Sequence, residues 1–224
     1  VSGKWVYQSE VIDYVEEDLF MAPDLSTIRK IPWNKEPTAQ IICDLNYPSN
    51  EPSKIAPRQV LKNIIKQLNN EDLQAVVAPE LEFYLCEQNL DPDLPLKTPI
   101  GKSGRRETGS RVFGIDAVNE FDKLTDDIYD YCELMNIGVD TLVHESGPSQ
   151  IEINLNHGDP LALADQAFMF KRAVRQVALK HNIHATFMAK PYQGQPGSSM
   201  HIHQNLVSAK TGANLFSDKE GNNS

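Results

Sequence analysis

Cysteine is scarce in this chain of 224 residues, and the cysteines that occur form no pattern. Cys43, Cys86 and Cys132 are odd in number and lie far apart in the sequence. Structural disulfides need pairs, and zinc knuckles need closely spaced ligands, so neither is expected here. This cysteine usage fits a reducing compartment, and we expect a cytoplasmic protein.

The chain also lacks a surplus of positive charge and a long apolar run. Its formal net charge of -10 at pH 7 argues against nucleic acid or an anionic membrane as a partner. No apolar stretch is long enough to span a bilayer, and the N-terminus shows no signal-peptide pattern. The first and last residues look cut from a longer protein.

Turn-forming residues divide the chain into two regions, with a Pro/Ser/Asn-rich break at 47–53. Before the break, strand-like pieces cover 17–21 and 40–45. After it, helical spacing of apolar residues predicts helices over about 57–68, 119–134 and 160–180. Alternating or short apolar runs predict strands over about 74–86, 142–154, 184–188 and 200–206. Because these strands are polar on one face, we expect an α+β fold with a half-solvated antiparallel sheet backed by helices.

The most informative segment reads Ala-Pro-Glu-Leu-Glu-Phe-Tyr-Leu and begins at Ala78. Side chains alternate between the faces of a strand, so Glu80, Glu82 and Tyr84 share one face and the apolar residues share the other. Two carboxylates on one face cost free energy unless cations lie between them. This strand is therefore the best indication of a functional site.

Two later segments repeat this alternation, and in one of them His201 and His203 share a face opposite Met200 and Ile202. Gln150, Glu152 and Asn154 share a face, with Glu145 just before them across a Gly-Pro turn. If the strands are neighbours, one sheet face collects the acids and imidazoles Glu80, Glu82, Glu145, Glu152, His201 and His203. An oxygen-rich set of this kind suits two Mg²⁺ or Mn²⁺ ions better than zinc, and two such ions suit phosphoryl transfer.

Each of these residues taken singly has a more ordinary interpretation. A lone Glu on a strand face is more often solvated, and an isolated His-x-His more often has a core or surface role. Co-occurrence in three strands, each with an apolar opposite face, favours the metal site. Phe83, Phe187 and Met200 are interpreted as core residues, and His144 receives no role from spacing.

At this point the motifs resemble those of the glutamine synthetase family. The matching segments are Glu-x-Glu-Phe, His-Glu with Gln-x-Glu, and Phe-Met-x-Lys-Pro followed by Gly-Ser-x-Met-His-x-His, in the family's order. Met21 to Thr27 is similar to the end of the family's small N-terminal domain. The resemblance implies that 1–46 are the C-terminal part of a β-grasp domain and that 47–224 are the first half of the catalytic domain.

The resemblance also implies a divided metal site and a ligase reaction. The first metal, at the γ-carboxylate of glutamate, would be held by Glu82, Glu145 and Glu152. The second, at the phosphates of the co-substrate ATP, would be held by Glu80 and His201. His203 would lie beside those phosphates, and Gly197 would contact glutamate through its backbone. In the family reaction ATP phosphorylates glutamate, and an amine then displaces phosphate to give a γ-glutamyl amide.

Departures from the family pattern indicate the amine. Pro196 stands where ammonia-using members have Asn, Ser199 replaces a Gly, and Asn205 takes a position often held by Ser. Ala189 and Tyr192 are more similar to the γ-glutamylpolyamine synthetase branch. We therefore expect a polyamine or another alkylamine as acceptor, with ammonia, as in ordinary glutamine synthetase, as the alternative.

The resemblance leaves the catalytic residues unassigned. Family members continue beyond Ser224 with the arginines, the glutamate flap and the last metal carboxylate, so the isolated 224-residue segment is expected to be inactive. The family's dodecamer of two hexameric rings is expected for the parent protein. A non-catalytic metal- or nucleotide-binding homologue and a two-metal hydrolase are the interpretations from other classes.

Overall fold

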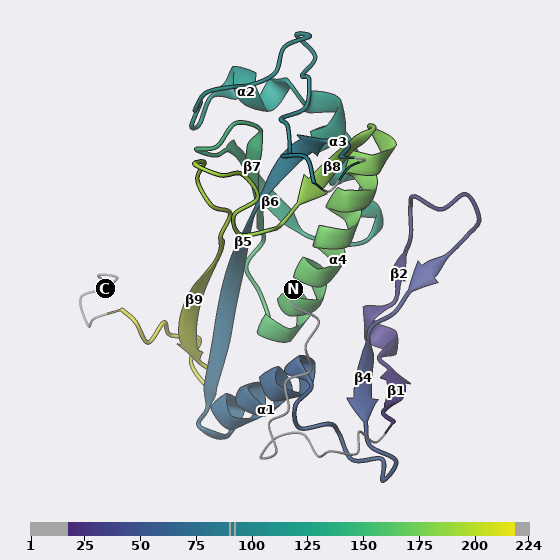
Figure 1. Cartoon of the computed structure of the whole chain (residues 1–224). Coiled ribbons are helices and arrows are strands. Elements are labelled where there is room, and N and C mark those ends of the chain that lie inside the picture. Colours follow the sequence, from purple (N-terminus) through teal and green to yellow (C-terminus); the bar gives the residue numbers. More distant parts are fainter. Residues whose placement is uncertain (1–17, 90, 92, 218–224) are drawn as a thin grey trace.

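The computed structural model describes residues 18–89, 91 and 93–217 (Figure 1). Its α-helices are α1 (Pro57–Asn70), α2 (Ile115–Asn119), α3 (Asp122–Leu134) and α4 (Pro160–Lys180). The strands of the main sheet are β5 (Leu73–Glu87), β6 (Val139–His144), β7 (Gln150–Leu155), β8 (Ile183–Thr186) and β9 (Met200–Ser208). The N-terminal part holds the short elements β1 (Phe20–Pro23), η1 (Leu25–Thr27), β2 (Arg29–Lys30), β3 (Ala39–Gln40) and β4 (Cys43–Asn46).

The main sheet has five strands, and every pair in it is antiparallel. Strand β5 is its longest, with β7 along one edge and both β9 and β8 along the other. β9 pairs with residues 73–81 and β8 with residues 84–87 of β5. Figure 1 shows β5 running diagonally through the molecule between these neighbours. The predicted α+β class, an antiparallel sheet backed by helices, is confirmed.

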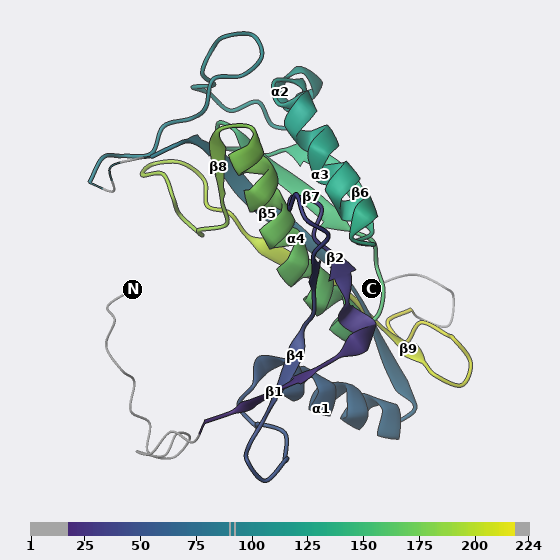
Figure 2. The ribbon, with the colours of Figure 1, turned by 90° about the vertical axis from the view of Figure 1, so that its right-hand side faces the viewer.

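The core lies between one face of this sheet and helices α3 and α4, which lie side by side in Figure 2. Helix α4 begins where the Asp159 carboxylate accepts a hydrogen bond from the Ala162 N–H at 2.9 Å, with Pro160 at its first position. The fully buried core residues include Leu81, Phe83, Leu85, Ile128, Ile151, Ile153, Phe170, Val174 and Val177. Burying each such side chain contributes about 1.5–3 kcal/mol, which fixes the sheet face that points inward.

Two predicted elements are each divided in the structure. The strand expected over 142–154 is two strands, β6 and β7, because a turn at residues 145–149 reverses the chain between them. The helix expected over 119–134 is interrupted after Asn119 and resumes at Asp122. The first break holds the Gly147-Pro148 turn that the sequence indicates, so the predicted strand should have ended before it, and the second falls at Glu120 and Phe121, where no Gly or Pro marks a break.

The prediction that Met200 is a core residue is wrong, since its exposed fraction is 45%. β9 pairs with the first half of β5, whereas α4 packs on β5 and β8, so within the described residues the apolar side chains Met200 and Ile202 of β9 stay largely exposed. Phe83 and Phe187 do pack together, with ring centroids 5.2 Å apart.

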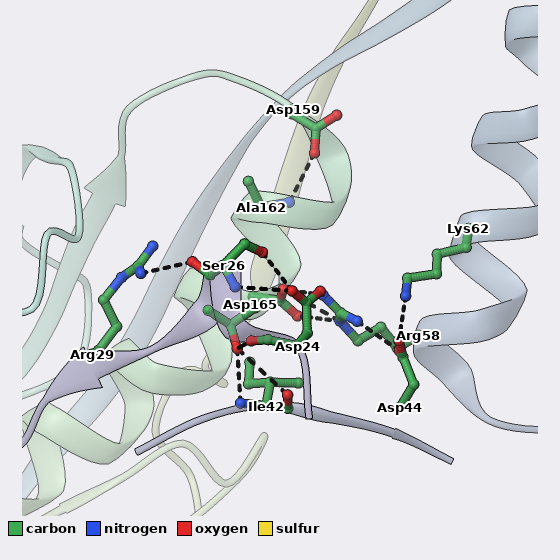
Figure 3. Close-up of polar contacts among 11 residues, drawn as sticks. Asp24, Ser26, Arg29, Ile42, Asp44, Arg58, Lys62, Asp159, Ala162 and Asp165 are labelled. Carbon is green, nitrogen blue, oxygen red and sulfur yellow. Dashed lines mark hydrogen bonds and ion pairs between the residues drawn. The ribbon is translucent and has the colours of Figure 1, made fainter. Parts of the chain in front are cut away.

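Arg58 of α1 joins the N-terminal strands to the main sheet's helices (Figure 3). Its guanidinium contacts Asp24 at 2.7 Å, Asp44 at 2.6 Å and Asp165 of α4 at 3.0 Å. Lys62 contacts Asp44 as well. The predicted boundary at 47–53 falls between β4 and α1, while the division into a β-grasp part and a catalytic part stays a prediction, and residues 1–17 lie outside the described residues.

Among the helices in the described part of the chain, none has the length and apolarity needed to cross a bilayer.

Candidate metal centre

Strand register brings the predicted acids and imidazoles to one face of the sheet. Glu82 on β5 stands directly opposite Glu152 on β7, and Glu80 stands opposite His201 on β9. His203 lies two residues further along β9, opposite Ala78. On β5 and β7 the opposite face is the buried core, so the acid face is the one left for the polar side chains of these two strands.

Three of these residues come close enough to contact a single ion. Ligand atoms of Glu80, Glu152 and His201 all lie within 4.8 Å of one another. Glu80 also contacts His201 Nδ1 at 3.3 Å and His203 Nε2 at 2.8 Å. The two imidazoles are 62% and 68% exposed, so a ligand can reach them from solvent.

The charges on this face are mutually unfavourable. Burial raises the pKa of the Glu152 carboxyl above its ordinary value, and the carboxylates of Glu80, Glu145 and Glu82 raise it further. Like charges directly opposite each other destabilise a strand pair. A divalent cation would offset both the burial and the repulsion, and carboxylates with imidazole are ligands that Mg²⁺ and Mn²⁺ accept. The residues present therefore fit the predicted metals.

Glu82 is held in place by neighbours from two other segments. Its carboxylate accepts hydrogen bonds from Gln150 Nε2 at 3.0 Å and from the Ser199 N–H at 3.1 Å, and the Ser199 hydroxyl donates to its other oxygen. Gln150 Nε2 also donates to the Gly197 carbonyl at 2.9 Å. The loop before β9 is thereby tied to the acid face. The contacts of Ser199 and Gln150 with Glu82 were not predicted, although alternation placed Gln150 on the correct face.

Gly197 occupies a position where a side chain would not fit. A Cβ there would lie 2.8 Å from the carbonyl oxygen of Ala189. That carbonyl also accepts a hydrogen bond from the Ser198 N–H at 2.9 Å, so the backbone is drawn in closely. The loop accordingly presents backbone groups, without a side chain, at the edge of the acid face.

Glu145 lies on the turn between β6 and β7. Its N–H donates to the Gln150 carbonyl at 2.8 Å, which closes the turn. Gly147 of this turn packs so closely on Tyr84 that an added Cβ would lie 1.9 Å from the Tyr84 hydroxyl. That hydroxyl donates to the Pro196 carbonyl at 2.7 Å. Tyr84 thus connects the turn carrying Glu145 with the loop carrying Gly197.

Comparison with known proteins shows which family of enzymes this chain resembles. A family model described as the catalytic domain of glutamine synthetase matches residues 54–224. γ-Glutamylputrescine synthetase PuuA of Escherichia coli is 38% identical over 93% of this chain and 44% of its own length. Glutamine synthetase of Methanocaldococcus jannaschii is 32% identical over 98% of this chain and 48% of its own. A glutamate–isopropylamine ligase of a Pseudomonas species is 31% identical, over 91% and 43%.

Solved structures show the same likeness. A complex of GmaS with ADP matches with a TM-score of 0.78 and 25% identity, over 93% of this chain and 46% of that one. GmaS without ligand matches with a TM-score of 0.78 and 25% identity, over 94% and 48%. The chain spans less than half the length of these curated and structural relatives.

Proposed function

Because the chain belongs to the glutamine synthetase catalytic-domain family, we propose that it takes part in the ATP-dependent ligation of glutamate to an amine. In this reaction ATP phosphorylates the γ-carboxylate of glutamate, and the amine then displaces phosphate to form a γ-glutamyl amide. The observation that carries the proposal is the sheet face on which Glu80, Glu82 and Glu152 gather beside His201. A scaffold without catalytic or binding function has no physical need to stack carboxylates in this way.

Two divalent cations, Mg²⁺ or Mn²⁺, are the proposed cofactors. The ion near glutamate is assigned to Glu82, Glu145 and Glu152, and the ion near ATP to Glu80 and His201. Bound there, the cations would neutralise charge as the phosphate and carboxylate groups approach each other. The proximity of Glu152 to Glu80 and His201 supports at least one ion on this face, and how the ligands divide stays a prediction.

The chain's own residues orient these ligands and the substrate. Ser199 and Gln150 fix the carboxylate of Glu82 by hydrogen bonds, so less rotamer freedom is lost when it binds. The backbone at Gly197 is proposed to contact glutamate, which agrees with the absence of room for a Cβ. His203 is proposed to lie beside the ATP phosphates, and its exposed imidazole next to Glu80 supports that role.

An organic amine is the proposed acceptor. Support comes from the names of two relatives, a γ-glutamylputrescine synthetase and a glutamate–isopropylamine ligase. Within the chain, Pro196 takes the place of the Asn found in ammonia-using members, and its carbonyl is held by Tyr84. Glutamine synthetases at 30–34% identity support ammonia as the second candidate.

The test is an acceptor comparison with the full-length protein that contains this chain. ATP consumption and γ-glutamyl product would be measured with glutamate plus putrescine, isopropylamine or ammonia at equal concentrations. We expect an organic amine to be used faster than ammonia, and much faster turnover with ammonia would exclude this acceptor class. The 224-residue chain by itself is expected to be inactive, and steady γ-glutamyl transfer by it would contradict that expectation.

A further inference from the structure

Glu107 belongs to the long connection between β5 and α2, yet its side chain is only 9% exposed. Its Oε2 accepts a hydrogen bond from the Ser149 N–H at 2.5 Å and lies 2.8 Å from Nε2 of His144. Ser149 and His144 stand at the two ends of the turn that carries Glu145. A single carboxylate oxygen therefore contacts both ends of this turn.

His144 extends the contact to Glu145 itself. The imidazole is 1% exposed, and its Nδ1 lies 2.8 Å from the backbone carbonyl oxygen of Glu145. A carbonyl oxygen only accepts, so Nδ1 carries a proton and donates it. The remaining nitrogen, Nε2, then faces the Glu107 carboxylate. The orientation of the ring is fixed at both nitrogens.

Other contacts hold Glu107 where it is. Its carbonyl accepts a hydrogen bond from the Thr98 hydroxyl at 3.0 Å, and the neighbouring Arg106 contacts the Thr98 carbonyl and pairs with Glu87 at 2.8 Å. Phe113, at the end of the same connection, donates its N–H to the His144 carbonyl at 2.9 Å. The connection is therefore fastened to the strands on both sides of Glu107.

We propose that Glu107 is a positioning residue that, through His144 and Ser149, fixes the turn on which Glu145 reaches the metal centre. The inference rests on the proposed function, because it assumes that Glu145 holds a metal there. Side chains that orient a metal ligand from behind typically change metal affinity by about 10–100-fold when removed. Glu107 does so from a segment remote in sequence, without contacting the ion's other ligands.

The test is Mn²⁺ titration of the purified protein by calorimetry. We expect Glu107→Ala to weaken one of the two Mn²⁺ binding steps about tenfold or more. The other step should stay within about threefold, because Glu80 and His201 stand on strands that the turn does not hold. A general loss of structure would weaken both steps alike, and that result would overturn the proposal.

A conservative replacement of Glu107 is the second part of the test. In Glu107→Gln an amide oxygen in the place of Oε2 still accepts from the Ser149 N–H, but the amide has no charge to offer the His144 ring. We therefore expect Glu107→Gln to weaken the affected Mn²⁺ binding step less than Glu107→Ala does, and an equal loss would contradict the role of the Ser149 contact. Glu133→Gln is the control for loss of a carboxylate, since Glu133 is an exposed residue of α3 outside these contacts, and it should bind Mn²⁺ unchanged.

The outcomes separate this inference from the proposed function. Absence of saturable Mn²⁺ binding in the wild type would refute the metal centre itself. Saturable binding in the wild type with an unchanged Glu107→Ala variant would refute only the positioning role. If the Ala variant does not fold, Glu107→Asp, which retracts the carboxylate by one methylene, decides in the same way: about tenfold weaker binding supports the role, and wild-type affinity overturns it.

Discussion

Replacing Arg58 with methionine should lower the unfolding free energy by weakening the attachment of the N-terminal strands to the rest of the fold. The guanidinium contacts three carboxylates whose side chains, like its own, are only 13–25% exposed. An exposed ion pair contributes about 0.2–1 kcal/mol, whereas removing one partner of a buried pair costs about 3–5 kcal/mol. Arg58 lies between these limits, so we expect the variant to lose about 2–4 kcal/mol of unfolding free energy at pH 7, measured by urea denaturation.

The loss should shrink in acid. The pKa of Asp24 is lowered to about 2 from the ordinary 3.8, first by its hydrogen bond with Ser26 and then by Arg58. A carboxyl with a lowered folded-state pKa stabilises the fold fully above the unfolded value and loses this contribution as the pH falls towards the folded value. The difference between wild type and Arg58→Met should therefore narrow as the pH falls from about 4 towards 2.

Lys102→Met is the control, because Lys102 and Asp122 form an ion pair that is 53% and 44% exposed. We expect this change to cost less than about 0.5 kcal/mol. An Arg58→Met variant that unfolds within about 0.5 kcal/mol of wild type would show that the reasoning is wrong. So would a difference that stays constant down to pH 2.

Three further predictions concern the metal centre and the core. Glu80→Ala should weaken the Mn²⁺ site proposed near ATP more than the other site, and Glu82→Ala the reverse, by about tenfold each in calorimetry; equal losses at both sites would refute the proposed division. Gly147→Ala should lower the unfolding free energy by about 1–3 kcal/mol in urea denaturation. Adding Tyr84→Phe should not restore this stability, because the new Cβ would still lie 2.5 Å from the ring carbon Cζ. Wild-type stability of Gly147→Ala would contradict the close packing. Burial raises the pKa of the Cys132 thiol to about 12. At pH 8 iodoacetamide should therefore alkylate Cys132 far more slowly in the folded protein than in urea, as measured by mass spectrometry. Equal rates would show that the thiol is accessible in the folded protein.

The shared acid face could be predicted from the sequence because alternation along a strand is a local property. Glu80 and Glu82 lie on one side of β5 whatever its neighbours are, and the same holds for His201 and His203 on β9. Which strands become neighbours is not local, and the pairing of Glu82 with Glu152 rested on an assumption that the register bears out. The proposed division of the metal ligands and the roles of His203 and Gly197 came from the motif resemblance, because periodicity indicates only which face a side chain is on.

Glu107 could not be found in this way. It stands in a polar connection with no periodicity, and its partners are 37 and 42 residues away in sequence. The only local signal was that His144 is the neighbour of Glu145, and spacing gave it no role. The prediction for Met200 was wrong for a related reason. Alternation indicates which face of a strand is apolar, but only the placement of the helices decides whether that face is covered.

The division of one edge of β5 between β8 and β9 has a consequence for how such a protein could change. The chain leaves the sheet at Thr186 and returns at Met200, and between the two pairings the Glu82 N–H donates to the Ser199 carbonyl at 3.2 Å. Phe187, Gly197 and Ser199 are tied to the core and to the acid face, so residues 188–196 are the part of this connection that can vary while the strand-borne acids keep their places. If the proposed function holds, exchange of these residues between relatives is expected to change the acceptor preference while the proposed metal ligands stay in place.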